Sequence, residues 1–270
     1  MLALTLLALA SPCKGSAAET RHFPHADKRY LRDHQHDGGA LLLPAGIAPD
    51  APMPLVVFLH GTNSAGELHL WLGGGGNYDL RTLARRLMDD DEVQPFLLAG
   101  PSQTKGAGLA RTLWSGFDLG EFVEDAARAA RGAATIDHAR VILVGHSGAG
   151  CNPTGGLAGR RTINGDYGPR ALVSIDPCLD AELGVAFGRR APSVPLTIWW
   201  QSAVWARSPE PFWAALQDQK PVSRIDRMTE LSVAGSNPHD AIVPIAFERA
   251  LRELLAPEPD ASSDDGEAPD

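Results

Sequence analysis

The stretch of the chain that decides its fold is residues 141–150, Val-Ile-Leu-Val-Gly-His-Ser-Gly-Ala-Gly. Four apolar residues suit a buried strand, and glycines stand at positions 145, 148 and 150 around the serine. Only such small neighbours let a strand and the following helix approach closely around a serine that is held in a strained conformation. A structural serine needs no such surroundings. The stretch therefore indicates a strand, a sharp turn and a helix, with Ser147 raised above the sheet edge as a nucleophile.

Apolar runs that suit strands alternate with helical spacing on both sides of this turn. Predicted strands lie at 40–44, 55–59, 96–99, 140–144, 171–175, 196–200 and 230–234, and predicted helices lie near 78–89, 119–133, 148–158, 209–218 and 243–255. This alternation predicts a single α/β domain over residues 40–256, with a mostly parallel central sheet and helices on both faces. A chain of 270 residues is long enough to bury one such core.

The two ends of the chain differ in character from the predicted domain. Residues 1–18 resemble a secretory signal peptide, because an apolar run is followed by small residues, and the run is too short to span a membrane. A lipid anchor at Cys13 and a cytosolic protein with an apolar start are the alternatives. Residues 19–39 are expected to form a polar, histidine-rich surface arm, and residues 257–270 a disordered acidic tail. The predicted location is therefore secreted or periplasmic.

Composition excludes several classes of function. Hydrophobic residues make up 44% of the chain and charged residues 21%, which is ordinary for a soluble protein. The net charge is −9, but six acidic residues lie within residues 258–270, and no basic face suggests a nucleic acid partner. No metal and no cofactor are expected, because the histidines of the arm lack matching cysteines or carboxylates at ligand spacing; these are His22, His25, His34 and His36.

Chemistry-bearing side chains follow several of the predicted strands. In a parallel sheet the functional loops gather at the carboxyl ends of the strands. Ser147 needs a partner that takes its proton, and His239, after the last strand, is the best candidate. A surface histidine that caps the final helix is the alternative for His239. His146 is expected to point away from the site and to pack, and His60 to support a neighbouring loop.

These features give the chain a resemblance to the α/β-hydrolase superfamily over roughly residues 40–255. It rests on the loop at 60–62 (His-Gly-Thr) after an apolar strand, the turn at 145–147 (Gly-His-Ser), and residues 237–240 (Asn-Pro-His-Asp). The order nucleophile, acid, histidine along the chain is the order of that family. Ala149 departs from the usual Gly-x-Ser-x-Gly pattern, although alanine is still small. In its motif order and short loops, the chain also resembles secreted feruloyl esterases and polyester depolymerases.

The resemblance implies a catalytic triad of Ser147, His239 and Asp176. Many relatives place the acid after the strand that here ends at Trp200, yet residues 201–205 contain no carboxylate. Asp176 follows the preceding strand and would accept the Nδ1 hydrogen of the histidine. Glu210 and Asp180 remain alternatives, and Asp176 would otherwise only cap the turn before Pro177. The backbone N–H of Gly148, and by resemblance that of Thr62, would form the oxyanion hole.

Further side chains are expected around this site. If the strands that precede them are neighbours, Cys151 and Cys178 form a disulfide; otherwise they are two small buried residues. Trp114 and Trp205 fall on loops at the catalytic end, where they line a substrate pocket or fold back onto the core.

The sequence therefore predicts a secreted serine esterase that acts on a small-molecule or polymer ester through an acyl-enzyme. A serine peptidase or amidase with the same triad is the second hypothesis, and a non-catalytic binding protein on a hydrolase scaffold is the third. Acyl transfer to an alcohol is a variant of the first.

Overall fold

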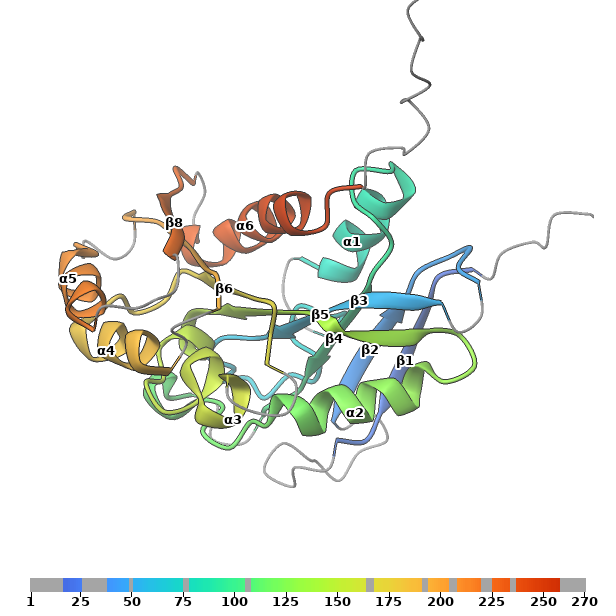
Figure 1. Cartoon of the computed structure of the whole chain (residues 1–270), viewed down its shortest axis with the longest axis horizontal. Coiled ribbons are helices and arrows are strands. Elements are labelled where there is room, and N and C mark those ends of the chain that lie inside the picture. The colour runs from blue at the N-terminus through green and yellow to red at the C-terminus, as the bar shows by residue number, and fades with distance from the viewer. Residues whose placement is uncertain are drawn as a thin grey trace, which may run out of the picture.

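The structure is a computed structural model of the whole chain (Figure 1). It describes residues 17–25, 38–48, 51–74, 78–104, 108–163, 168–190, 194–203, 208–219, 225–233 and 237–257. Several predictions fall largely or wholly outside these ranges: the leader at 1–18, most of the arm at 19–39, Trp205, and the acidic tail at 257–270.

One mixed sheet runs through the centre of the molecule. Within the described residues it has eight strands in the order β1-β2-β4-β3-β5-β6-β7-β8. The strands are β1 (Glu19–Phe23), β2 (Gly39–Leu43), β3 (Pro52–Leu59), β4 (Leu97–Pro101), β5 (Thr135–His146), β6 (Ala171–Ile175), β7 (Leu196–Trp200) and β8 (Ile225–Glu230). β1 pairs antiparallel with β2, and β2 pairs antiparallel with β4. All other neighbours are parallel, as the alternation of strands and helices predicts.

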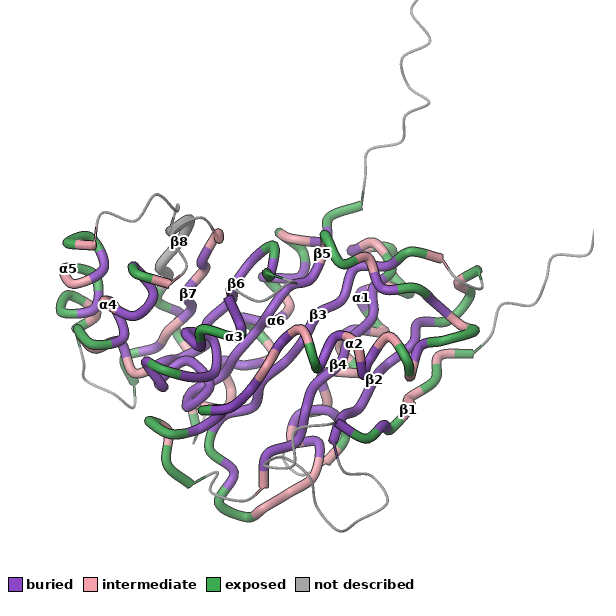
Figure 2. The backbone as a smooth tube through the Cα atoms, turned by 60° about the horizontal axis from the view of Figure 1, so that its bottom comes forward, coloured by how far each residue is buried: buried purple, intermediate pink, exposed green. Residues whose placement is uncertain are grey.

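Helices cover both faces of the sheet, and the side chains of the central strands explain why. Leu55, Val57 and Leu59 of β3 face one hydrophobic core, whereas Val56 and Phe58 face a second. Figure 2 shows that the central strands are buried along most of their length. The second core includes α1 (Leu80–Asp89) and α6 (Pro238–Leu254), and the first includes α2 (Leu119–Ala130), α3 (Arg160–Ile163), α4 (Ala181–Arg190) and α5 (Glu210–Asp218).

Several local predictions differ from the structure. Residues 19–23, expected in a surface arm, form the edge strand β1, whose main chain pairs with β2. The helix expected over 148–158 is broken into the 3₁₀ turns η2 (Ser147–Gly150) and η3 (Gly156–Ala158), because Pro153 has no N–H to donate and Gly156 adopts a φ of +51°. The last strand is β8 at 225–230 instead of 230–234, and α4 was not expected at all.

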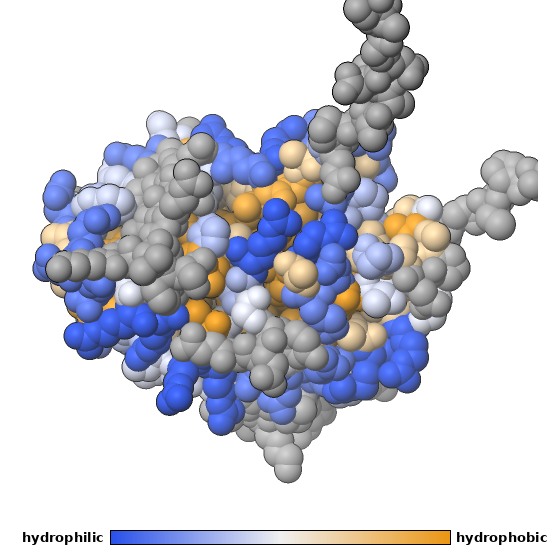
Figure 3. All heavy atoms as spheres, viewed as in Figure 1, coloured by the Kyte–Doolittle hydropathy of each residue, from blue (hydrophilic) through white to orange (hydrophobic). Residues whose placement is uncertain are grey.

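On the face drawn in Figure 3, hydrophobic residues appear in small patches among hydrophilic ones. Among the described residues, large exposed hydrophobic side chains are few: Tyr78, Leu109, Trp213 and Ile245. Among the same residues, no helix has the length and hydropathy that a membrane span requires.

Candidate active site

Ser147 occupies the sharp turn that the sequence predicts. It follows the last residue of β5 with a φ of +51°, a left-handed conformation that is rare and costly for a residue with a side chain. Small residues make the turn fit: a Cβ on Gly61 would lie 2.7 Å from the Ser147 Cβ, and a Cβ on Gly145 would lie 2.8 Å from the Leu157 Cγ. Ala149 is fully buried in the same turn, so its methyl group is accommodated.

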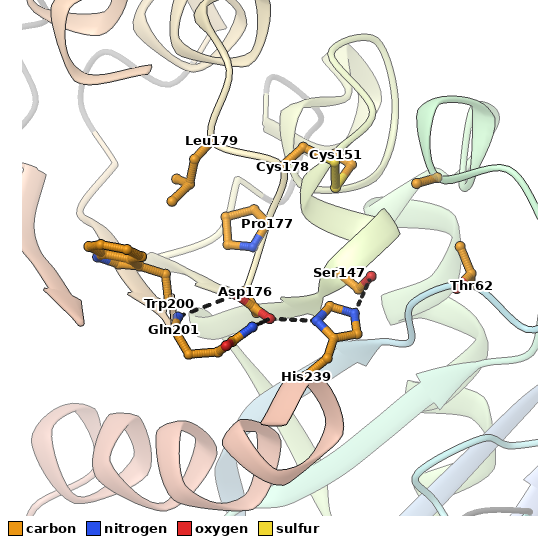
Figure 4. Close-up of a pocket in the computed structure, with 11 residues that line it drawn as sticks. Thr62, Ser147, Cys151, Asp176, Pro177, Cys178, Leu179, Trp200, Gln201 and His239 are labelled. Carbon is orange, nitrogen blue, oxygen red and sulfur yellow. Dashed lines mark hydrogen bonds and ion pairs between the residues drawn. A yellow bond between two sulfur atoms is a disulfide. The ribbon is translucent and has the colours of Figure 1, made fainter. Parts of the chain in front are cut away.

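Three side chains from distant segments meet at this turn (Figure 4). The Ser147 hydroxyl lies 2.8 Å from Nε2 of His239, in position to donate to it, and His239 Nδ1 lies 2.5 Å from Oδ2 of Asp176. Ser147 and Asp176 follow the adjacent parallel strands β5 and β6, whose ends pair at His146 and Ile175. The arrangement is one in which the carboxylate orients the imidazole and the imidazole can take the hydroxyl proton.

His239 enters the site from the first turn of α6. Asn237 caps this helix, since its side-chain oxygen accepts from the Asp240 N–H, and Pro238 occupies the first turn, where its missing N–H is not needed. The helix starts earlier than the predicted 243, so His239 lies on the helix itself. Its side chain keeps 19% of its surface exposed, which leaves it accessible from the cavity beside it.

Asp176 is almost fully buried, and the residue that holds it is Gln201. The Gln201 side-chain N–H donates to Asp176 Oδ2 over 2.8 Å, and its backbone N–H reaches Oδ1 at 3.4 Å. Sequence reasoning noted that no carboxylate follows β7 but did not assign Gln201 a role; its place directly after that strand was the available signal. The alternative acids do other work: Asp180 caps α4 and pairs with Arg111. Glu210 begins α5.

Thr62 and Gly148, the two residues predicted to form the oxyanion hole, both lie near the serine turn. Thr62 lines the cavity that contains Ser147, and the preceding Gly61 packs directly against the serine Cβ. Gly148 follows Ser147 in η2, with its Cα face against Leu113 and Ala110. Gly148 therefore adjoins the serine and Thr62 borders the same cavity. The aim of their N–H groups toward a substrate oxyanion stays a prediction.

His60 stabilises the loop that contains Thr62 through hydrogen bonds of its ring. Its Nδ1–H donates to the Gly61 carbonyl over 2.7 Å, and its Nε2 accepts from the Gln103 N–H over 3.0 Å. Burial lowers the pKa of His60 to about 4, so the ring is neutral in the folded protein at neutral pH. Trp114 completes this support, because its indole N–H donates to the His60 carbonyl over 2.9 Å. The prediction that Trp114 lines the substrate pocket is wrong: its side chain is fully buried beneath the loop.

A cavity of about 290 Å³ opens on one side of Ser147 and His239 (Figure 4). Its wall away from the triad is mainly apolar and comprises Ala110, Cys151, Pro177, Cys178, Leu179 and Trp200. Trp200, the last residue of β7, therefore contributes the indole that sequence reasoning sought on the loops.

A second cavity of about 270 Å³ opens on the other side of the same two residues. It also contains Thr62, so the nucleophile lies at the junction of two spaces. Its lining includes more polar side chains, among them Asn63, Ser64, Glu67, Tyr78 and Asp240. The site can thus hold a molecule that extends in both directions from the serine.

Cys151 and Cys178 form a disulfide, with their Cα atoms 5.0 Å apart. Cys151 follows the nucleophile turn, and Cys178 lies two residues beyond Asp176. The bond therefore ties the serine segment covalently to the acid segment. A crosslink that closes a loop of this size contributes roughly 3 kcal/mol through the restricted unfolded chain. Within the described residues, no group of three or more histidine, cysteine or acidic side chains is arranged to hold a metal ion.

The chain has the α/β-hydrolase fold. It is similar to a ferulic acid esterase from Anaeromyces mucronatus, with 12% identity, a TM-score of 0.54, and coverage of 91% of this chain and 93% of that one. It is also similar to an esterase from the planctomycete Thermogutta terrifontis, with 14% identity, a TM-score of 0.53, and coverage of 90% and 95%. An acylaminoacyl peptidase from Pyrococcus horikoshii matches with 15% identity and a TM-score of 0.51, over 90% of this chain and 43% of the peptidase. No family model and no curated protein sequence matches the chain.

Proposed function

We propose that this protein is a serine hydrolase that cleaves a carboxylic ester through an acyl-enzyme intermediate. The observation that carries the proposal is the continuous line of hydrogen bonds from Ser147 through His239 to Asp176, at the junction of two cavities. A buried carboxylate, an accessible imidazole and a hydroxyl in a strained turn are the parts that nucleophilic acyl transfer needs.

The proposed reaction follows from these positions. Ser147 Oγ attacks the ester carbonyl carbon while His239 Nε2 accepts the hydroxyl proton, and Asp176 stabilises the resulting imidazolium. The N–H groups of Gly148 and Thr62 would stabilise the tetrahedral oxyanion, each by about 3 kcal/mol. His239 then returns the proton to the departing alcohol, and the ester to Ser147 forms. Water, deprotonated by the same imidazole, then attacks the acyl carbon, and the acid leaves as His239 returns that proton to Ser147 Oγ.

The two cavities support binding of the acyl part and the alcohol part of the substrate in separate spaces. An acyl group with apolar surface fits the wall formed by Pro177, Leu179 and Trp200, because burial of apolar surface is favourable there. The alcohol part then extends past His239 into the more polar cavity, where the returning proton is delivered. An amide substrate would use the same groups, and acyl transfer to a second alcohol would use the same intermediate.

We further propose that the protein is exported to a secreted or periplasmic location. The disulfide supports an oxidising compartment, since such bonds are rare in reducing cytosol. The apolar start of the chain at residues 1–18 supports removal of a leader on export. Mass spectrometry of the protein secreted by its host would show a start near residue 19, whereas an intact first residue in the cytosol would contradict export.

A fluorophosphonate probe and a substrate panel test the proposed activity. We expect the wild type to be labelled at Ser147 and to cleave p-nitrophenyl esters faster than the matching p-nitroanilides. Ser147→Ala should lose both labelling and turnover, whereas Ser232→Ala, on the exposed surface, should keep both. Faster anilide cleavage would favour the peptidase hypothesis, and an unlabelled, inactive wild type would favour a binding protein.

A further inference from the structure

His146 is the neighbour of Ser147 in sequence, but it contacts His239. The residue is 3% exposed, and its ring lies against the His239 ring, with the ring centroids 4.6 Å apart and the planes tilted by 39°. The Trp71 ring also packs against the His146 ring in a T-shaped arrangement, with the centroids 5.7 Å apart and the planes at 85°. The expectation that this side chain points away from the site is therefore wrong. The His146 ring packs against His239, the residue that is proposed to transfer protons.

A directed hydrogen bond accompanies this packing. His146 Nε2–H donates to the main-chain carbonyl of His239 over 3.1 Å. The other ring nitrogen, Nδ1, is buried and has no hydrogen-bond partner among the described residues. Donation to a carbonyl requires the proton on Nε2, so the contact selects one neutral tautomer. The bond is thus a fixed link between the end of β5 and the first turn of α6.

We propose that His146 is a positioning residue, which holds the main chain of His239 so that its imidazole stays aligned between Ser147 and Asp176. The inference rests on the proposed function. The three reacting side chains come from three segments, and a displacement of α6 by about 1 Å would misalign both hydrogen bonds of His239 at a cost near 100-fold in rate. The link to β5 ties His239 to the same strand that ends in the nucleophile turn.

The neutral state of His146 is part of this role. His239 becomes a cation in the transition state, and a second cation at ring-contact distance would oppose it. Burial, assisted by the nearby His239 and His60, lowers the pKa of His146 well below its ordinary value. His239 faces His146 from α6, and His60 lies near it in the loop after β3. Glu67, Tyr78 and Asp240 line the same cavity as His146. The His146 ring is therefore neutral at neutral pH.

Two substitutions separate the hydrogen bond from the packing. His146→Phe keeps an aromatic ring but removes the donor, whereas His146→Gln keeps an amide donor near the position of Nε2. We expect His146→Phe to lower kcat by about 10- to 100-fold with KM within about twofold of wild type, because alignment and not binding is lost. His146→Gln should recover most of kcat. His138→Phe, an exposed site on the same strand, is the matched control and should leave kcat unchanged.

A measurement on the wild type keeps the inference testable if the variants fold poorly. In protein labelled with ¹⁵N-histidine, His146 should show a slowly exchanging Nε2–H and no titration as the pH passes through 6.5, the ordinary pKa of a histidine. The inference would be overturned if His146→Phe kept the wild-type kcat, or if His146→Phe and His146→Gln folded normally and lost kcat equally. Titration of His146 in the wild type would overturn it as well. A wild type that cleaves no ester would instead contradict the proposed function. Failure of the role of His146 and failure of the proposed function are therefore distinguishable.

Discussion

The pair His25–Asp125 and the pair His239–Asp176 have nearly the same contact, yet their surroundings differ. His25 Nδ1 lies 2.7 Å from Asp125 Oδ2, and His239 Nδ1 lies 2.5 Å from Asp176 Oδ2. His25 is completely buried, with its ring edge-on to Phe122, and links the end of β1 to α2. His239 keeps 19% of its side chain exposed and meets Ser147 on its other nitrogen. A histidine–carboxylate contact alone therefore does not mark a reactive site; access and a nucleophile do.

The second partner of each carboxylate differs as well. Asp125 also pairs with the guanidinium of Arg128, a full positive charge. Asp176 receives the neutral amide of Gln201, so its charge remains available to stabilise an imidazolium at His239. The first arrangement suits a structural link between two segments. The second suits a carboxylate whose charge is needed by a neighbour that changes protonation.

The largest expected effect comes from neutralising each carboxylate in turn. Asp176→Asn should lower kcat by about 10⁴-fold, because the histidine loses both its tautomer and the charge that stabilises its protonated form. Asp125→Asn should leave kcat within about twofold of wild type but lower the free energy of unfolding by about 3 kcal/mol, since a buried pair loses one partner. Ester kinetics and urea denaturation of both variants measure this. Equal losses of kcat would abolish the distinction between the pairs.

His60 is a buried histidine of a different kind, because its two ring nitrogens bond to main-chain groups, the Gly61 carbonyl and the Gln103 N–H. Burial lowers the pKa of His60 to about 4, below the value near 6.5 in the unfolded chain. Between pH 4 and pH 6.5 the unfolded chain binds a proton that the folded chain excludes. The free energy of unfolding therefore keeps its full value above pH 6.5 and falls as the pH drops below it. His60 alone accounts for about 3 kcal/mol of this loss, at about 1.4 kcal/mol per pH unit.

Denaturation of wild type and His60→Gln at pH 7, 6, 5 and 4.5 checks the sign and the size. The variant should show a shallower decline of the free energy of unfolding with acid, by about 1.4 kcal/mol per pH unit. His146, whose pKa burial also lowers, should maintain part of the decline in both proteins. Parallel curves for the two proteins would mean that His60 does not contribute.

The contrast between predicted and unpredicted parts of the site has a physical basis. Ser147, Asp176 and His239 were placed at one sheet edge because each follows an apolar run, and parallel strands bring their carboxyl ends together. β1 was missed because its polar, partly exposed residues pair through the main chain and leave no hydrophobic signature. Gln201 and His146 were missed as partners because their contacts cross 25 and 93 residues of chain, which no local pattern reports.

Removal of the neutral partner of Asp176 should have a smaller effect than removal of its charge. Gln201→Leu should lower kcat by about tenfold, which corresponds to one hydrogen bond to a charged acceptor. The carboxylate stays in place, so labelling by a fluorophosphonate should persist at a reduced rate. Gln217→Leu, on the exposed face of α5, is the control and should have no effect on either rate. A loss as large as that of Asp176→Asn would mean that Gln201 is indispensable to the acid.

The smallest expected effect lies at the other pair. Arg128 is 58% exposed, so its ion pair with Asp125 is screened by solvent, and Arg128→Ala should lower the free energy of unfolding by about 0.5 kcal/mol with unchanged kcat. Urea denaturation at low and high salt measures it, and the difference from wild type should shrink as salt rises. If Arg128→Ala instead matched the cost of Asp125→Asn, the guanidinium would be the main counter-ion of that carboxylate. His25 would then be a packing residue beside an ion pair, and the likeness between the two histidine–aspartate pairs would be one of distance only.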